Sequence, residues 1–246
     1  MKQLFLGLVV AGVLSGCVSY TTPGGPAVIS ELASANINEL MATEPAANFP
    51  ARIAVVRVQA PGYESFENQG FGQGRYSVML TRDVESDDDF SKLASFDGVA
   101  GVGTLNRLLL PTRLDSIESL REAAARLKAD VLLLYTFDTT FQAGEQRFLP
   151  LNTVALGFLK NKKVTVTTTA SAAMFDVRTE FLYGLAEATA QEYKQASVWG
   201  EAQTVDDLRV VTERTAFGKL VGEIEKSWNG VLREHAYSAM ANDTLK

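Results

Sequence analysis

The chain has 246 residues, of which 46% are hydrophobic and 21% are charged, and its formal net charge at pH 7 is −6. This composition is typical of a packed globular protein rather than a disordered one. The longest basic run is Lys160-Asn161-Lys162-Lys163. Nucleic-acid binding needs clustered Lys and Arg to displace counterions, so we expect no nucleic-acid partner.

The first twenty residues, MKQLFLGLVVAGVLSGCVSY, have the order of a secretory signal peptide. Lys2 gives a positive start, residues 4–14 form an uncharged apolar run, and small residues precede Cys17. The apolar run is too short for a membrane-spanning helix, which needs about 20 residues. We therefore expect residues 1–16 to be a signal peptide that is removed.

Cys17 is the only cysteine, and it ends the motif Leu14-Ser15-Gly16-Cys17. This motif resembles the lipobox of bacterial lipoproteins. The resemblance implies that the Cys17 thiol receives a diacylglyceryl group, that the bond before it is cut, and that the new N-terminus is acylated, for example with palmitate. It also implies sorting to the outer membrane, because Val18 stands where an Asp would favour the inner membrane. The alternative is a plain signal peptide or membrane anchor with an incidental cysteine.

The residues after the cysteine predict a lipidated tether. Two or three acyl chains would hold the protein stably, since one chain gives only marginal binding. Residues 17–28 include the sequence VSYTTPGGPAV, which is rich in proline, glycine and hydroxyl residues and is typical of a linker. Residues 29–50 are expected to be a short helix and linker. With Cys17 lipidated, no thiol is left for a disulfide, so the fold must rest on its core.

We expect one α+β domain over residues 51–238, followed by a tail over 239–246. Its first strand is 53–58, a β-branched run that a Pro-Gly pair ends. Further strands are expected at 76–80 and 105–110.

Two polar stretches between these strands resemble ligand loops. Gly70, Gly72 and Gly74 suggest a phosphate loop, but they alternate, lead into a strand and lack a Walker lysine, so we favour a plain loop. Residues 87–89 are three aspartates, which suggests calcium, but no Gly or Glu follows at EF-hand spacing. We expect them to form the first turn of a helix that ends near Leu93, where acidic residues favour the helix dipole.

The middle of the chain predicts a crossover unit followed by a long hairpin. Residues 115–130 have the pattern of a helix capped by Asp115, and an apolar strand follows at 131–141. A strand, a helix and an apolar strand in this order favour a central strand covered on both faces. Residues 164–176 and 181–193 are rich in Val, Thr and Ala and should pair antiparallel.

The C-terminal part predicts a long amphipathic helix from Thr204, with Thr204 and Asp207 approximating a capping box. Phe217, Leu220 and Ile224 fall on its apolar face. The fold class is therefore α+β, with a mixed or mostly antiparallel sheet packed against a crossover helix and this long helix.

Residues 148–159, FLPLNTVALGFL, carry no charge and are unusually apolar for a connection. Ordinary packing is the preferred interpretation, and contact with a membrane or partner is the alternative. If the segment contacts a partner, Leu156 and Phe158 are the candidate contact residues.

Few residues are available for catalysis. His235 is the only histidine, so neither a zinc set of His and Cys nor a Ser-His-Asp site with a G-x-S-x-G elbow is indicated. We expect no metal and no cofactor. Asp138, Asp176 and Glu187 come from strands expected to be neighbours, and a pair of them could act on a glycan. These positions also suit strand ends and solvent-facing sites, and we favour a protein that is not an enzyme.

Several segments between about residues 50 and 235 resemble bacterial envelope lipoproteins. RIAVVRV, the run REAAARLKAD into VLLLYTFDTTF, and TTTASAAMFDVRTEFLYGLAEA resemble the α+β domain of the curli-secretion-channel lipoprotein. GRYSVMLTRDVES, LNRLLLPTRLDS and FDVRTEFLYGLAEAT resemble the rhombotail or rhombotarget lipoproteins. These motifs are structural and specify no reaction.

The sequence thus predicts a lipoprotein of the outer membrane, facing the periplasm, that serves as a non-catalytic assembly, secretion or scaffold factor. Its expected partners are membrane lipid, through acylated Cys17, and other envelope or secretion proteins. One alternative is a homo-oligomeric, channel-like lipoprotein. A second is a cell-wall glycan hydrolase that depends on the carboxylates named above.

Overall fold

The computed structural model describes residues 19–33, 36–155, 163–195 and 202–236. The strands, in chain order, are β1 (Ser19–Thr21), β2 (Ala51–Gln59), β3 (Gln73–Gly74), β4 (Ser77–Met79), β5 (Val99–Thr104), β6 (Arg113–Leu114), β7 (Val131–Ala143), β8 (Gln146–Phe148), β9 (Thr153–Ala155), β10 (Lys163–Asp176) and β11 (Leu182–Gln195). The helices are α1 (Ile37–Ala42), α2 (Asp87–Ala94), α3 (Glu118–Arg126) and α4 (Ala202–Val231), with 3₁₀ turns η1 (Ile29–Glu31) and η2 (Arg107–Leu109) and a π-helical turn η5 (Leu232–Ala236).

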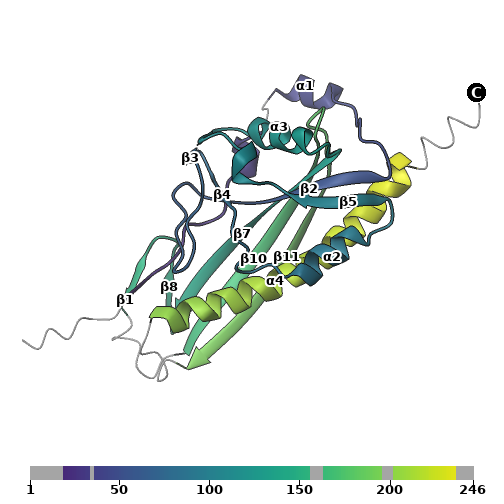
Figure 1. The fold of residues 1–246 in the computed structure, drawn as a ribbon. Coiled ribbons are helices and arrows are strands. Elements are labelled where there is room, and N and C mark those ends of the chain that lie inside the picture. Colours follow the sequence, from purple (N-terminus) through teal and green to yellow (C-terminus); the bar gives the residue numbers. More distant parts are fainter. Residues whose placement is uncertain (1–18, 34–35, 156–162, 196–201, 237–246) are drawn as a thin grey trace, which may run out of the picture.

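A seven-stranded mixed sheet lies between α4 on one face and α3 on the other (Figure 1). The strand order is β11-β10-β7-β2-β4, with β5 also paired to β2 and β8 to β7. The β2 strand pairs parallel with β7 and β5, whereas β7, β10 and β11 pair antiparallel. The predicted α+β class, with a crossover helix and a long C-terminal helix, is confirmed.

The central strand β7 shows why both faces need cover. Residues 131–137 are all buried, because α4 covers one face of this stretch and α3 the other. Phe217 of α4 packs on Tyr135, with ring centroids 4.9 Å apart, and Leu120 of α3 packs in the opposite cluster with Leu132. Such uninterrupted apolar runs are typical of doubly covered strands.

Strands β10 and β11 form a long hairpin, and β11 is the edge strand at one side of the sheet. The two strands pair from Lys163 opposite Gln195 to Phe175 opposite Leu182, and the register shifts at a bulge between Met174 and Phe175. Alternate residues of β10 from 164 to 170 are buried toward α4, and the residues between them are half-buried. This alternation is the pattern of a sheet with one covered and one open face.

Most expected elements appear in the structure. The strands expected at 53–58, 76–80, 131–141, 164–176 and 181–193 are confirmed as β2, β4, β7, β10 and β11. The helix expected from Asp87 is also confirmed, with Ser86 and Asp89 forming its capping box.

The strand expected at 105–110 is wrong. The strand β5 lies just before it, at Val99–Thr104, and residues 107–109 form the turn η2 with Asn106 as its cap. The sequence VAGVGT has two glycines, which lower its intrinsic strand propensity. Backbone hydrogen bonds to β2 stabilise the strand despite this low propensity.

The predicted helix caps are also wrong. The helix α3 begins at Glu118, and its N-cap Ile117 makes no side-chain cap, whereas Asp115 binds Arg113. The helix α4 already includes Ala202, so Thr204 lies inside the helix. The short helix expected within 29–50 is present as two separate elements, η1 and α1.

Within the tether expected at 17–28, residues 19–21 belong to the folded body. Ser19–Thr21 form β1, which pairs antiparallel with β9, and the Tyr20 side chain is only 2% exposed. The prolines and glycines nearby suggested a linker. The buried aromatic ring of Tyr20 and the pairing with β9 instead fix this short strand to the core.

Within the described ranges, no helix is long and apolar enough to cross a membrane.

The aromatic packing predicts a large stability difference between two positions of α4. Phe217→Ala should lower the free energy of unfolding by about 3–5 kcal/mol, because Phe217 is 1% exposed and contacts three other rings. Val211→Ala, at a residue that is 46% exposed, should change it by about 0.5 kcal/mol or less. Urea unfolding measures both, and equal losses would contradict this core.

Candidate functional site

Two buried arginines form the most highly charged region of the interior. Arg57 comes from β2 and Arg209 from α4, and their side chains are 2% and 0% exposed. Four buried carboxylates surround them: Asp83, Glu85, Asp206 and Glu213. We call these six residues the buried charge cluster.

Arg209 holds the helix side of the cluster together. Its Nε donates to Asp206 Oδ1 at 2.8 Å and its Nη2 to Asp206 Oδ2 at 3.1 Å. Its Nη1 donates to Glu213 one turn further along α4, and its Nη2 lies 3.6 Å from Asp83 Oδ2. One guanidinium therefore binds three carboxylates.

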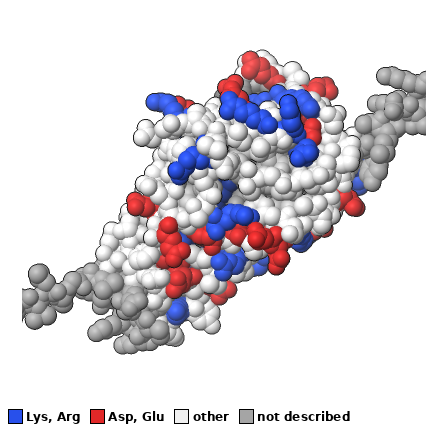
Figure 2. Space-filling view, in the orientation of Figure 1, with Lys and Arg blue, Asp and Glu red and all other residues white. Residues whose placement is uncertain are grey.

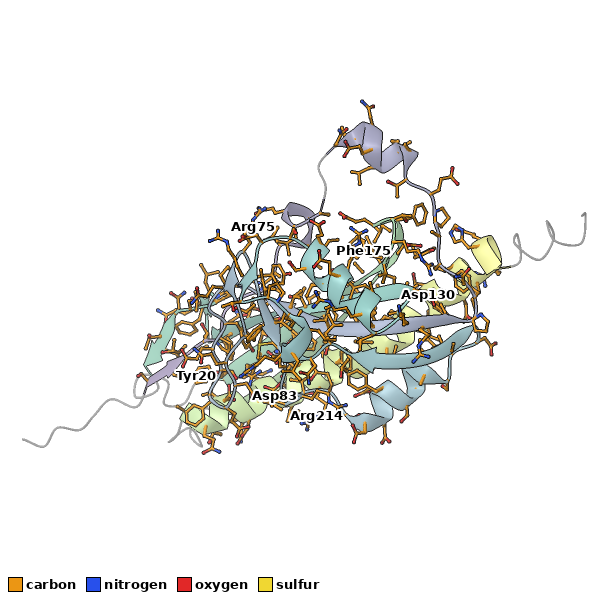
Figure 3. All side chains as sticks on the ribbon, turned by 45° about the horizontal axis from the view of Figure 1, so that its top comes forward. Tyr20, Arg75, Asp83, Asp130, Phe175 and Arg214 are labelled. Atoms are coloured by element: carbon orange, nitrogen blue, oxygen red, sulfur yellow. The ribbon has the colours of Figure 1, made fainter. Side chains whose placement is uncertain are left out.

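Arg57 connects the sheet to the same group. Its Nη1 donates to Asp83 Oδ1 at 3.0 Å, and its Nη2 lies 3.5 Å from Glu213 Oε2. The guanidinium also stacks over Phe137, 4.5 Å from the ring centroid. Figure 3 labels Asp83 close to Arg214, whose guanidinium donates to the Asp83 carbonyl at 3.1 Å.

The cluster contains four acids and only two arginines, and the acids respond differently to burial. Desolvation raises the pKa of Glu213 above its usual value, although Arg209 and Arg57 oppose this effect. Desolvation also acts on Asp83, but Arg57 and Arg209 outweigh it and lower the pKa of Asp83. Arg57 Nε and Glu85 Oε2 are buried without a hydrogen-bond partner among the described residues.

Tyr20 joins the first strand to this cluster. Its hydroxyl donates to Asp206 Oδ1 at 2.8 Å, the same oxygen that accepts from Arg209. Burial raises the pKa of Tyr20 above its usual value, so the hydroxyl stays a donor. The ring packs against Phe141 with centroids 5.6 Å apart. The strand β1 is thus held by a buried contact as well as by β9.

The residues proposed for lipidation, sorting and partner contact cannot be placed. Cys17, Val18, Leu156 and Phe158 lie outside the described residues. Their assignments stay predictions. Within the described part of the chain, the nearest residue to Cys17 along the sequence is Ser19, the first residue of β1.

Asp176 lies apart from the other two candidate carboxylates. Asp138 pairs in register with Thr169 of β10, and Asp176 lies seven residues further along that strand, about 23 Å away at the usual strand rise. Paired glycosidase carboxyls lie within about 10 Å. Glu187 is exposed on β11 and accepts from Ser171, whose register partner on β7 is Thr136.

Asp176 has a clear structural role. It is fully buried, and its Oδ2 accepts from the Ala46 amide at 2.7 Å and the Tyr183 hydroxyl at 2.8 Å. Its Oδ1 accepts from the amides of Arg178 and Thr179. Burial tends to raise its pKa, but these donors outweigh that effect and lower it. Asp176 therefore fixes the β10–β11 turn.

Neither suggested ligand loop forms a site. Gly72 and Gly74 adopt φ of +100° and +128° against Leu114, which an added Cβ of either would overlap. Asp89 is used in the cap of α2. In the described ranges, no three His, Cys, Asp or Glu side chains are placed to hold one metal ion. His235 packs edge-on against the rings of Phe181 and Tyr183.

Three hollows meet around the open edge of β5, and Thr104 lines all of them. Their volumes are about 510 Å³ beside Phe90, about 140 Å³ beside Leu127 and about 50 Å³ beside Tyr135. None of the three is lined by Asp138, Asp176 or Glu187. On the face shown in Figure 2, acidic and basic side chains lie next to one another rather than in separate patches.

The buried charge cluster was missed from the sequence, although two signals were present. Arg57 is the one charged residue inside the apolar run 53–58, and such a residue must find partners when the strand is buried. Asp206, Arg209 and Glu213 follow helical spacing on the same face as the apolar residues of α4.

Comparison with known proteins gives distant structural likeness only. No protein-family model matches the sequence, and no curated protein matches it. Solved structures that it resembles include the PelC dodecamer from Paraburkholderia phytofirmans (12% identity, 72% of this chain and 91% of that one, TM-score 0.32). They also include hypothetical protein CT253 from Chlamydia trachomatis (12%, 71% and 95%, 0.33) and lipoprotein GNA1162 from Neisseria meningitidis (15%, 66% and 96%, 0.30). Likeness at this level carries no functional conclusion.

The cluster predicts that Arg209 is essential for stability. Arg209→Met should lower the free energy of unfolding by about 3–5 kcal/mol, because it leaves three buried carboxylates without that cation. Lys226→Met, on the exposed side of α4 where Lys226 pairs with Glu223, should cost about 0.5 kcal/mol or less. Urea unfolding compares them, and similar losses would contradict a stabilising cluster.

The hydrogen bonds to Asp176 predict a pH dependence. Because its pKa is lowered in the folded state, its contribution is complete above its usual pKa of 3.8 and is lost as the pH falls below that value. Asp176→Asn should reduce stability at pH 7 and flatten the loss of stability below about pH 4. Asp138→Asn, at an exposed residue, is the matched control and should keep the wild-type slope. Unfolding measured from pH 2 to 7 decides this, and an unchanged acid slope in Asp176→Asn would contradict it.

Proposed function

We propose that this protein is a lipid-anchored envelope protein of the outer membrane, facing the periplasm, that acts by binding rather than by catalysis. Its role is that of an assembly, secretion or scaffold factor. The partners are other envelope or secretion proteins, and an oligomer of the chain with itself is the alternative.

The observation that carries this proposal is the motif Leu14-Ser15-Gly16-Cys17 at the end of the uncharged apolar run 4–14. The lipobox-like motif ends at Cys17, and the first strand of the folded body begins two residues later at Ser19. Cleavage before Cys17 would remove residues 1–16 and leave the described body intact.

The placement of the ionisable residues supports binding over catalysis. Asp176 is saturated by four hydrogen-bond donors, and the acids of the buried charge cluster are bound to arginines inside the protein. A general acid or base must reach a substrate proton within about 3 Å. The carboxylates Asp138 and Glu187 lie on the open face of the sheet, and neither lines any of the three hollows around β5.

The test is fractionation and crosslinking in cells. Wild-type protein should incorporate radiolabelled palmitate, sediment with outer membranes and give discrete crosslinked complexes that mass spectrometry identifies. Cys17→Ser should lose the label, the membrane fraction and the hetero-complexes, because the thiol that carries the lipid is gone. Ser15→Ala is the control, since it keeps a small residue before the cut and should behave as wild type.

Three outcomes would contradict the proposal. Label incorporation that persists in Cys17→Ser would exclude the lipid anchor. Loss of all crosslinks from a lipidated wild type, together with glycan turnover that Asp138→Asn abolishes, would favour the hydrolase alternative. Ladders of the chain with itself would instead favour the oligomeric, channel-like alternative over a scaffold.

A further inference from the structure

The first strand is a fixed part of the body rather than a flexible leader. All three residues of β1 pair with β9, and Thr22 continues the contact, with its amide donating to the Asn152 carbonyl at 3.0 Å. The Thr22 hydroxyl donates to the Leu149 carbonyl at 3.0 Å and is itself buried. Together with the hydrogen bond from Tyr20 to Asp206, these contacts hold β1 to β9, to the residues just before β9 and to α4.

The chain between Cys17 and β1 is too short to act as a tether. Cys17 is two residues before Ser19, and two residues span at most about 7 Å even when fully extended. The backbone of Cys17, to which the lipid is joined through the side chain and a glyceryl group, must therefore lie within about 7 Å of the start of β1, whatever path those two residues take.

Building on the proposed lipidation of Cys17, we propose that the end of the domain formed by β1 and β9 rests directly on the phospholipid surface. The domain then has a fixed orientation, with the end that carries α1 directed away from the membrane. The partner of this surface is the bilayer in which the acyl chains are inserted.

The chemistry of this end suits contact with lipid headgroups. The exposed side chains of the β1–β9 ribbon are those of Ser19, Thr21 and Thr153, which are small, uncharged and able to hydrogen-bond. Lys163 at the start of β10 is also exposed and belongs to the same end, because Val164 packs in one cluster with Tyr20. A cation there favours anionic headgroups, although the whole chain has a net charge of −6.

The opposite end of the molecule is set by the length of the hairpin. The strand β10 runs for 14 residues from Lys163 to Asp176, about 45 Å at the usual rise. Asp176 binds the Ala46 amide just after α1, so α1 lies at the other end of this strand from β1 (Figure 1). Met41 on α1 is 83% exposed and marks that end.

The test uses the acylated full-length protein in vesicles of phosphatidylethanolamine and phosphatidylglycerol. Thr153→Cys and Met41→Cys each offer one exposed thiol for an NBD fluorophore, while Cys17 is blocked by its lipid. A spin-labelled headgroup lipid then quenches the fluorophores that lie near the bilayer surface. Quenching at position 153 should be several-fold greater than at position 41.

A spacer variant separates fixed orientation from simple anchoring. Ten Gly and Ser residues inserted between Val18 and Ser19 keep the acylation but add a flexible chain of about 17 Å average span. Quenching at position 153 should then fall toward the value at position 41. Equal quenching of the two sites in the original protein, or no effect of the spacer, would overturn the proposed orientation.

The failure of the lipid anchor itself would look different. Intact-mass measurement reports the acyl chains on Cys17 before reconstitution, and flotation reports whether the protein binds vesicles. Protein without acyl chains that does not float would overturn the proposed function and the orientation with it, whereas acylated, floating protein with equal quenching overturns the orientation alone.

Discussion

The pairing of Arg57 and Arg209 with four buried carboxylates is the constraint on which the rest of the structure depends. A buried ion is costly unless its partners are present in good geometry. Arg57 belongs to β2, Arg209 to α4, and Asp83 to the segment after β4, so these three parts must meet at one place. Apolar packing, such as that of Phe217 on Tyr135 and Phe137, is non-directional and specifies the position of α4 along the sheet less strictly than ion pairs do. The charges fix that position, because one turn of shift would separate Arg209 from Asp83.

The same interaction reaches the N-terminus. Asp206 accepts a hydrogen bond from Arg209 and another from Tyr20 through one oxygen, so β1 is fixed to the helix that the cluster positions. A tether made only of proline, glycine and hydroxyl residues would leave the domain free to turn above the membrane. A strand that is paired, buried and bound to a carboxylate does not allow this. If Cys17 carries the proposed lipid, β1 joins that anchor to α4 through the hydrogen bond from Tyr20 to Asp206.

Several ionisable residues outside the buried charge cluster also have structural roles. Asp176 closes the β10–β11 turn and also binds the segment that follows α1, and Asp89 caps α2. Arg121 joins α3 to the same turn through Glu180 and two backbone carbonyls. Asp89 was considered from sequence as part of a calcium loop and Asp176 as part of a glycan site. In the structure both carboxylates are used in local hydrogen bonds instead. Among the described residues, the open face of the β10–β11 hairpin and the free edge of β5 are exposed to solvent.

The sequence by itself determined the elements whose signals are local. The apolar run of β7, the alternation of β10 and β11, the acidic start of α2 and the lipobox-like end at Cys17 all follow from periodicity, capping or motif chemistry within a few neighbouring residues. Only the tertiary structure decided the rest. It made a strand of glycine-rich 99–104, because β2 offers that segment a free edge. It also made a strand of residues 19–21 and placed Arg57 beside Arg209, because those outcomes depend on partners more than a hundred residues away, and contacts of that range leave no periodicity in the local sequence.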